Sequence, residues 1–365
     1  MRIAVVTTGV MEIPGPKNKI YAPGQIISNL VEGLIALGHE VSLFASKESR
    51  TSAELISEDL ISAHTEIGEL QYSDPDNYYM VKNSTDMYLI NSLIREHKKK
   101  PFDIIHSHDY RNIMFFSNFI DKPIVYTHHG NPVNCLKYEV EKKRFKKFYN
   151  NSLFVGITRN QIKDPIIKEY FNFIDVVYNS VDLNLFKFNS EPENKLIYAG
   201  RMRENKGPHI ALEAAKRANE KIVVAGSGTG QFWQEKVLPY SDDPNTEFLG
   251  HVPYEQMPKL FGESKAFIFP LTHDEPFGMV VIEAMACGTP VIAYDNGPVH
   301  ELIDDGVTGI IVKDNSIEAL VEAIKQIDKI DRKKCREHVE QKFDTSVMVR
   351  GYETVYKKVV SEYGK

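Results

Sequence analysis

Two cations in the second half of the chain are spaced as a phosphate-binding segment requires. Arg201 and Lys206 lie five residues apart, directly after the apolar run Leu196–Ala199. Arginine can bind a phosphate through two parallel hydrogen bonds, and lysine binds it as a point charge. Gly200 beside them lets the backbone approach a ligand closely. Taken alone, the segment fits a solvated charged turn equally well.

A glycine-rich turn follows the next apolar run. Gly226, Ser227 and Gly228 come directly after Ile222–Ala225. The backbone N–H groups of such a turn can cradle a phosphate. One glycine turn is weak evidence, because tight turns use the same residues. Its place after a second apolar run makes it a candidate for ligand binding.

Two glutamates flank the start of an apolar run that we predict to be a helix. Glu275 precedes Pro276, a residue suited to the first helical position, and Glu283 lies within Met279–Cys287. Their spacing is about two helical turns, so both carboxylates can point to one side of the helix start. The structural alternative is a helix cap at Glu275 and a partly exposed Glu283.

The same helix start offers backbone donors. If Pro276 opens the helix, the N–H groups of Phe277, Gly278 and Met279 lie in its first turn and lack partners within the helix. Such groups, together with the helix dipole, favour an anion. We therefore expect them to face an anionic ligand.

Histidines gather after two apolar runs of the first half. His128 and His129 follow Ile124–Thr127, and His106 and His108 lie around the end of Phe102–His106. Alternation along a strand puts His106 and His108 on the same face. The four could form a metal site, or they could brace the loops that carry them.

Elements that position these residues follow from the alternation of apolar runs and helical patterns. Expected strands are Ile3–Thr7, Val41–Ala45, Phe102–His106, Ile124–Thr127, Leu153–Ile157, Val176–Tyr178, Leu196–Ala199, Ile222–Ala225, Phe267–Leu271, Val291–Ala293 and Gly309–Val312. Expected helices are Ile26–Leu37, Asp86–Lys98, His209–Asn219, Met279–Cys287 and Val347–Tyr363. Such alternation predicts an α/β fold with parallel sheets flanked by helices. Ligands bind such sheets beyond the carboxyl ends of the strands, where the candidate residues lie.

The polar stretch Asn189–Lys195 divides this series into two and is predicted to be a linker. We therefore expect two Rossmann-like domains, one over residues 1–188 and one over residues 189–345, with the active site in a cleft between their facing sheets.

The long run from Glu275, E-P-F-G-M-V-V-I-E-A-M-A-C-G-T-P-V-I-A, contains an E-x7-E motif. This run resembles the retaining glycosyltransferases of family 4, which have the GT-B fold. Several other segments are similar to parts of the same family: Gly200–Gly207 to its diphosphate-binding segment, Gly226–Gly228 to its glycine turn, Gly250–Val252 to the strand end that meets the nucleobase, and Asn179–Asp182 to its N-G-V-D segment. Ser180 stands where that last segment usually has glycine.

The resemblance extends to the first half. Thr127-His128-His129 is similar to a T-x-H pattern, which implies that His129 contacts the donor sugar. Thr158 matches a Ser/Thr near the cleft, and Tyr21–Gln25 stands in place of the family's first glycine pair, of which Gly24 remains. The final helix, residues 346–365, is expected to pack back on the first domain.

The roles implied by the resemblance fall into three groups. Catalytic residues would be His129, Glu275, Arg201 and Lys206. Donor-binding residues would be Gly24, Gly200, Gly226, Ser227, Val252, Phe277, Gly278, Met279 and Glu283, with Glu283 holding the ribose hydroxyls. Acceptor-side residues would be Gln25 and Thr158.

A retaining transfer from a nucleoside-diphosphate-sugar to an acceptor hydroxyl is the activity that the resemblance implies. The leaving diphosphate carries the developing charge, and Arg201, Lys206 and the helix-start N–H groups are suited to stabilise it. We therefore expect neither a metal nor a cofactor. A UDP-linked hexose is the default donor, and the acceptor is an unidentified carbohydrate, lipid or small molecule.

Bulk composition excludes other classes. The net charge is −6, without the basic footprint of a nucleic-acid binder. Three separated cysteines predict no disulfide framework. Neither a signal peptide nor a run of ~18 apolar residues is present, so we expect a cytoplasmic protein.

The basic stripe Lys137–Lys147 could contact an anionic membrane or a phosphorylated acceptor. Alternatively, it could be a solvated helix with its aromatic residues in the core.

Three alternatives remain open at this point. A GT-B isomerase of UDP-sugars would need acid and base groups for chemistry at C2. A metal-dependent hydrolase would use His106, His108, His128 and His129. A non-catalytic sensor would bind the nucleotide sugar without turnover.

Overall fold

The computed structural model describes residues 1–16, 21–68, 74–108 and 110–363, and the chain divides into two compact units. Unit 1 comprises Met1–Tyr178 and Thr345–Lys365, and unit 2 comprises Asn179–Asp344. Residues 179–188, which we expected in the first domain, belong to unit 2. There, the Phe186 carbonyl accepts a hydrogen bond from Arg336 at 2.6 Å.

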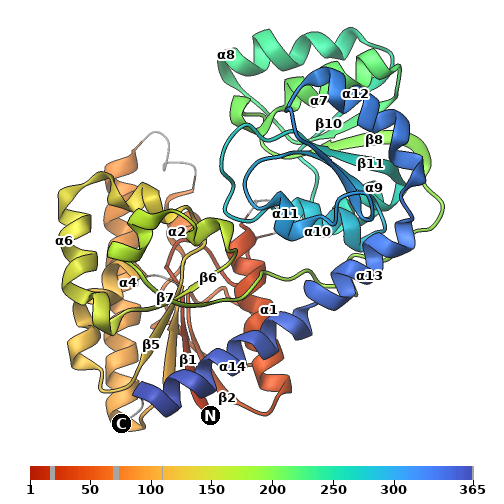
Figure 1. Cartoon of the computed structure of the whole chain (residues 1–365). Coiled ribbons are helices and arrows are strands. Elements are labelled where there is room, and N and C mark those ends of the chain that lie inside the picture. Colours follow the sequence, from red (N-terminus) through yellow and green to blue (C-terminus); the bar gives the residue numbers. More distant parts are fainter. Residues whose placement is uncertain (17–20, 69–73, 109, 364–365) are drawn as a thin grey trace. The chain divides into compact units, whose positions relative to one another are not determined.

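The described part of unit 1 contains a seven-stranded sheet whose paired strands are all parallel, in the order β3-β2-β1-β4-β5-β6-β7 (Figure 1). The strands are β1 Arg2–Val6, β2 Glu40–Phe44, β3 Glu54–Ile56, β4 Ile104–Ser107, β5 Ile124–Thr127, β6 Leu153–Gly156 and β7 Asn172–Val176. The central ones are continuous apolar runs, as strands covered on both faces must be.

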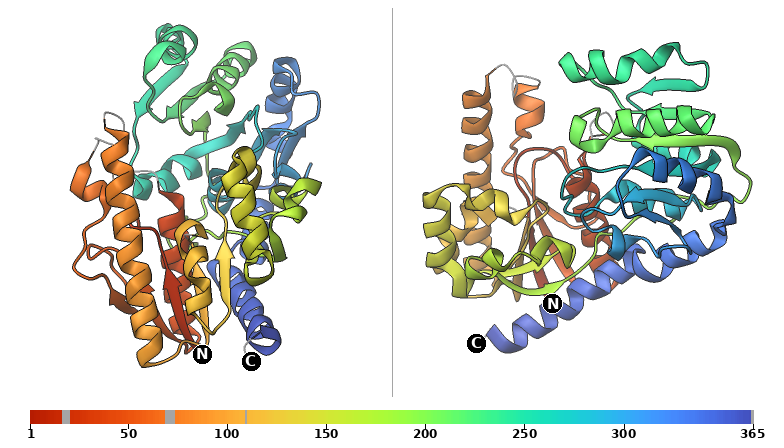
Figure 2. Two further views of the ribbon diagram at one scale, coloured as in Figure 1. Left: turned by 90° about the vertical axis from the view of Figure 1, so that its left-hand side faces the viewer. Right: turned by 45° about the horizontal axis from the view of Figure 1, so that its top comes forward.

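Helices cover both faces of this sheet (Figures 1 and 2). They are α1 Ala22–Ala36, α2 Ala63–Ile67, α4 Pro75–Lys99, α5 Tyr110–Ile113, α6 Glu139–Phe148 and α14 Thr345–Tyr363. Helices α4 and α6 pack in one core cluster with Ala4 and Val6 of β1. On the other face α1 packs against α14, so closely that a Cβ on Gly33 would lie 2.3 Å from Val349 Cγ2.

The described part of unit 2 contains a six-stranded sheet, again with all paired strands parallel, in the order β10-β9-β8-β11-β12-β13. Its strands are β8 Glu193–Ala199, β9 Ile222–Ala225, β10 Thr246–Gly250, β11 Ser264–Phe269, β12 Val291–Tyr294 and β13 Gly309–Val312. The helices are α7 Pro208–Ala218, α8 Gly230–Phe232, α9 Met257–Glu263, α10 Met279–Ala286, α11 Val299–Leu302, α12 Ile317–Gln326 and α13 Arg332–Lys342.

Both faces of the second sheet are covered as well. Helices α7 and α12 share one core cluster with β8 and β9, and α10 packs against α9 and α13. The α/β class with two Rossmann-like parallel sheets is therefore confirmed. None of the described helices combines the length and the apolar content that crossing a bilayer requires.

Several sequence-based element bounds were wrong, among them that of the helix expected over Asp86–Lys98, which is α4 and begins at Pro75. The strand expected at Val176–Tyr178 is β7, Asn172–Val176, where Asn172 and Asp175 shorten the apolar run and hide the strand. The linker expected over Asn189–Lys195 ends early, because β8 begins at Glu193. The helix expected from Ile26 begins at Ala22, so Gly24 and Gln25 lie in its first turn rather than in a loop.

Candidate active site

Tyr198 organises the loop that carries the two candidate cations. Its ring is buried in the core at the end of β8, and its hydroxyl lies 3.3 Å from the Arg201 carbonyl and 3.2 Å from the Lys206 carbonyl. The hydroxyl thus fixes the backbone of both cations at once. Sequence reasoning missed Tyr198, because a tyrosine in an apolar strand is indistinguishable from an ordinary core residue.

Lys206 forms an ion pair with Glu275, and this contact joins the loops that follow β8 and β11. His273 also lies at this junction. Its Nε2 lies 3.2 Å from Glu275 Oε2, and its Nδ1 donates to the Asn205 carbonyl at 2.9 Å. Because β8 and β11 are neighbours in the sheet, their carboxyl ends bring these side chains together, as expected. The Arg201 side chain is exposed and has no ion pair within the described residues.

Gly226 lets the glycine turn after β9 contact the loop after β8, which carries Arg201 and Lys206. Its N–H donates to the Gly250 carbonyl at 2.7 Å, and a Cβ there would lie only 2.1 Å from the Gly200 carbonyl oxygen. No other residue fits this approach without moving the backbone. Ser227, next in the turn, is exposed. The loops after β8, β9 and β10 are therefore packed together at one edge of the sheet.

Helix α10 spans Met279–Ala286, close to the expected Met279–Cys287, and does not open at Pro276. Its first residue is Met279, and Gly278 precedes it with a φ of 102°, which no right-handed helix can include. Pro276 and Phe277 therefore lie outside the helix, and Pro276 does not take the first helical position to which it is suited. Phe277 is buried, with its ring against Phe343 at a centroid distance of 6.2 Å. Of the three residues expected in the first turn, only Met279 lies in it.

Glu283 is a buried carboxyl group rather than a partly exposed one. Its side chain lies within α10, 6% of the residue is exposed, and Oε1 accepts a hydrogen bond from the Tyr254 hydroxyl at 3.3 Å. Burial raises the pKa of Glu283 to about 7. Tyr254 belongs to the segment after β10 that also contains the half-buried Val252, and it packs against Phe186. A strongly shifted carboxyl group of this kind favours a functional site.

His129 lies just after β5 in unit 1 and is partly exposed. Its Nε2 atom is 2.9 Å from Nδ1 of His108. Burial lowers the pKa of His129 to about 4 and that of His128 to about 3. These imidazoles are therefore neutral at neutral pH.

His106 is buried in a second set of hydrogen bonds, to Tyr356 of α14 and Thr127 of β5. Its Nδ1 lies 2.6 Å from the Tyr356 hydroxyl, and its Nε2 lies 2.8 Å from Thr127 Oγ1. Thr127 Oγ1 is in turn 2.9 Å from the Tyr352 hydroxyl. Both nitrogens of His106 are thus occupied by protein groups, and the described residues contain no cluster of His, Cys, Asp or Glu arranged to hold a metal ion. His106 thus braces the ends of β4 and β5 against α14.

Gln161 holds the segment that carries His129, and the sequence analysis missed it. Its Nε2 donates to the carbonyls of His128 and Gly130, at 2.6 and 2.7 Å. Its own N–H donates to Oγ1 of the buried Thr158 at 3.0 Å. Thr158 therefore shapes the turn after β6 that positions Gln161. Gly24 N–H donates to the Tyr21 carbonyl, and Gln25 Nε2 donates to Asn29 Oδ1.

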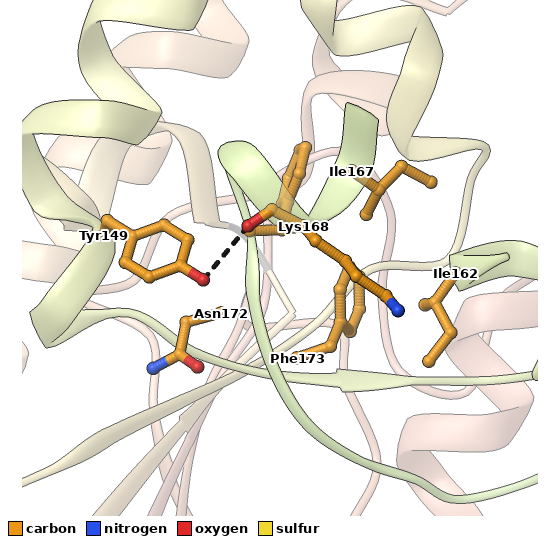
Figure 3. Close-up of a pocket in the computed structure, with 7 residues that line it drawn as sticks. Tyr149, Ile162, Ile167, Lys168, Asn172 and Phe173 are labelled. Atoms are coloured by element: carbon orange, nitrogen blue, oxygen red, sulfur yellow. Dashed lines mark hydrogen bonds between the residues drawn. The ribbon is translucent and has the colours of Figure 1, made fainter. Parts of the chain in front are cut away.

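A pocket of 260 Å³ lies elsewhere in unit 1, beside β7 (Figure 3). Across it, the Tyr149 hydroxyl donates to the Lys168 carbonyl at 3.1 Å. The lining is mostly apolar and includes none of the candidate site residues: Tyr149, Ile162, Ile167, Lys168, Phe171, Asn172 and Phe173. This pocket therefore does not compete with the strand-end loops as the active site.

The basic stripe Lys137–Lys147 is helical from Glu139 onward, in α6. Phe145 and Phe148 are buried in the core. Lys142 pairs with Glu139 at 2.6 Å, and Lys146 lies over the ring of Tyr170. Phe145 and Phe148 thus belong to the core, whereas Tyr138 within the stripe is exposed.

Comparison with known proteins agrees with this geometry. Residues 24–185 match the family described as Glycosyltransferase Family 4, and residues 182–342 match Glycosyl transferases group 1. A glycogen synthase of Mycobacterium tuberculosis is 26% identical over 251 residues, which are 62% of this chain and 60% of that protein. The match thus spans less than two thirds of that relative.

Two further comparisons cover more of the chain. An uncharacterised glycosyltransferase of Methanocaldococcus jannaschii is 24% identical over 342 residues, 82% of this chain and 83% of its own length. The crystal structure of Alr3699/HepE from Anabaena, solved with UDP and glucose, covers 98% of this chain and 100% of its own, with a TM-score of 0.70 and 17% identity. That likeness shows the GT-B fold.

The two family matches together extend from residue 24 to residue 342. They agree with the E-x7-E segment and with the strand-end loops of unit 2. The chain belongs to the group 1, family 4 glycosyltransferases.

Proposed function

We propose that this glycosyltransferase moves a hexose from a UDP-sugar to an acceptor hydroxyl with retention of anomeric configuration. The observation that carries the proposal is the Lys206–Glu275 ion pair at the carboxyl ends of β8 and β11, in the unit that also holds the buried Glu283. The fold neighbour solved with UDP and glucose supports the choice of nucleotide.

Charge stabilisation is the main chemical task. When the anomeric C–O bond breaks, negative charge develops on the diphosphate, and preorganised cations lower the barrier most when they need not move. Lys206 is held by its backbone contact to Tyr198, and the exposed Arg201 is available to the same ligand. A bound diphosphate would compete with Glu275 for Lys206 and leave the Glu275 carboxylate to accept hydrogen bonds from the sugar.

Glu283 would hold the ribose. Burial favours its neutral form, whereas two ribose hydroxyls donating to the carboxylate would favour the ionised form. The pKa near 7 therefore leaves Glu283 able to change protonation state when the nucleotide binds. Tyr254 holds one carboxylate oxygen in place for that contact.

Retention follows from displacement on one face of the sugar. The anomeric carbon loses its bond to the diphosphate oxygen and gains a bond to the acceptor oxygen, while the acceptor proton passes to the departing phosphate. His129 would contact the donor sugar beside the breaking bond. No metal or cofactor is needed for this balance of charge and protons.

A thermal-shift panel of UDP-, GDP-, ADP- and CMP-sugars tests the donor. A ligand that binds the native state raises the melting temperature. We expect a selective shift with a UDP-hexose that is lost in Glu283→Ala, followed by transfer to an acceptor with the anomeric proton coupling of a retained product. Stable binding without turnover on any acceptor would favour a sensor, and an inverted product would reject the mechanism.

We further propose that the protein works in the cytoplasm and reaches a membrane-bound acceptor through Lys137–Lys147. Cys135, Cys287 and Cys335 are buried free thiols, which suits a reducing compartment. Beside the lysines, Tyr138 and Val140 are 68% and 70% exposed. Exposed apolar side chains among cations are the composition that binds an anionic lipid surface.

A further inference from the structure

His108 is a buried histidine to which the proposed function gives no task. It follows β4, and its Nδ1 lies 2.9 Å from Nε2 of His129. The two ring centroids are 5.1 Å apart and the ring planes differ by 17°. A short N···N contact between nearly parallel rings at this separation is the edge-to-edge geometry of an imidazole–imidazole hydrogen bond.

Such a bond has two arrangements. A neutral imidazole carries one N–H donor and one bare nitrogen acceptor. Burial lowers the pKa of both His129 and His108, so both rings are neutral at neutral pH. Either His108 donates from Nδ1 to His129, or His129 donates from Nε2 to His108.

The second nitrogen of His108 decides between the two. His108 Nε2 is buried and has no hydrogen-bond partner among the described residues. If His129 were the donor, His108 would carry its proton on Nε2 and bury an N–H group without an acceptor. If His108 is the donor, Nε2 is a bare lone pair, and a buried acceptor without a partner is better tolerated than an orphaned N–H group.

We infer that His108 is a positioning residue, which donates its Nδ1–H to Nε2 of His129 and thereby fixes His129 in the tautomer that carries its proton on Nδ1. The two rings then lie in a fixed relation at the ends of the neighbouring strands β4 and β5. The ring of His106, with its centroid 4.2 Å from that of His108, limits the rotation of the donor.

The consequence is a defined donor on the ligand side of His129. Its Nδ1 makes no hydrogen bond to the part of the chain that the structure describes, and the residue is partly exposed. His129 therefore presents an N–H group to an oxygen of its ligand, and it cannot accept a proton there. That the ligand is the donor sugar rests on the proposed function, whereas the tautomer itself does not.

Nitrogen NMR of the full chain tests the tautomer directly. In a sample labelled with ¹⁵N-histidine, long-range ¹H–¹⁵N correlations distinguish protonated from bare ring nitrogens, and His129→Gln identifies the His129 signals among the 12 histidines. At pH 7 we expect a protonated Nδ1 and a bare Nε2 in His129. In His108→Leu we expect the pattern to reverse, because free histidine in water prefers the Nε2 proton. A protonated Nε2 in the unaltered protein would overturn the inference.

Kinetic measurements distinguish a positioning role of His108 from a role in filling space. We expect His108→Leu to lower kcat about tenfold, the equivalent of one lost hydrogen bond, with unchanged affinity for UDP, which lacks the sugar. His108→Asn places an amide N–H where Nδ1–H was and should recover most of the loss. Equal losses in the two variants would reject the positioning role.

A double-mutant cycle gives the last check. If His108 acts through His129, His108→Leu should have no further effect on kcat in a His129→Ala background. Additive effects would show that His108 acts independently of His129 and would overturn the inference. Absence of transfer by the unaltered protein would count against the proposed function, and the NMR result would still decide the tautomer.

Discussion

The ammonium group of Lys206 and the carboxylate of Glu275 form an ion pair, although 69 residues separate them in the sequence. Both side chains are mostly buried, with 14% and 21% of their surface exposed. An anionic ligand that binds Lys206 must therefore compete with a partner that is already in place. A diphosphate that binds Lys206 would therefore release the Glu275 carboxylate from its ion pair.

Replacing Lys206 by alanine should lower turnover by about 100- to 1,000-fold, because one preorganised charge on the leaving group is lost. The fold should survive, since Tyr198 contacts the backbone of residue 206 rather than its side chain. Steady-state kinetics and a melting curve measure the two effects. Lys325→Ala, an exposed lysine of α12 paired with Glu322, is the matched control. Near-normal turnover in Lys206→Ala would refute the assignment.

Glu283→Gln should change stability in a pH-dependent way. Because the pKa of Glu283 is raised from 4.5 to about 7, the unfolded chain releases this proton at a lower pH than the native protein. Its ionisation therefore costs native stability as the pH rises through this range. Relative to the unaltered protein, the free energy of unfolding of Glu283→Gln should gain about 2–3 kcal/mol between pH 5 and pH 8.

Urea unfolding of both proteins at the two pH values measures this gain. Glu318→Gln, at a side chain that is 74% exposed, should show no such dependence. Glu283→Gln should also bind UDP about tenfold more weakly, because a neutral amide is a poorer acceptor for ribose hydroxyls. A parallel pH dependence in all three proteins would mean that Glu283 ionises normally.

Transfer activity should persist in EDTA. The charges that stabilise the leaving diphosphate belong to side chains, and the described residues contain no arranged set of metal ligands. The measurement is initial rate with and without chelator, with added Mg²⁺ or Mn²⁺ as the reverse test. Complete loss in EDTA that a divalent ion restores would assign a metal to the reaction.

Neutralising the lysines of α6 should weaken binding to anionic vesicles. The change is Lys142, Lys143, Lys146 and Lys147 to glutamine, and sedimentation with phosphatidylglycerol vesicles is the measurement. A loss of about 1 kcal/mol per charge is expected for side chains at the lipid surface. Phe145 and Phe148 are untouched and buried, so the melting temperature should hold. Equal vesicle binding by the unaltered protein and the variant would show that α6 does not contact the membrane.

Local spacing predicted much of the fold and the proximity of Lys206 and Glu275. Lys206 and Glu275 could be placed together because each follows a buried strand, and carboxyl ends of parallel strands share one edge. The apolar run placed the start of α10 at Met279, but the segment before it was wrongly assigned to the helix, because Pro276 looks like a helix opener while Gly278 takes a conformation that no helix includes. A glycine in the sequence does not reveal the sign of its φ.

The contacts of the histidines could not be predicted from the sequence for a different reason. The partners of His106 and Thr127 lie 250 and 225 residues away, in Tyr356 and Tyr352. These tyrosines are four residues apart in a helical pattern, so their common face was predictable, but the strand ends that they meet were not. Distant pairing of this kind depends on which helix covers which sheet, and no local spacing encodes it.

The return of the chain to unit 1 through α14 has a consequence for biosynthesis. The sheet of unit 1 leaves the ribosome first, yet the hydroxyl groups of Tyr352 and Tyr356 reach Thr127 and His106 only after all of Asn179–Asp344 has been translated. At bacterial-to-eukaryotic rates of about 5–20 residues per second, that interval is on the order of ten to thirty seconds. During it, the face that α14 covers is bare, and nascent chains need protection there. A chain that ends within unit 2 therefore lacks the helix that completes unit 1 as well.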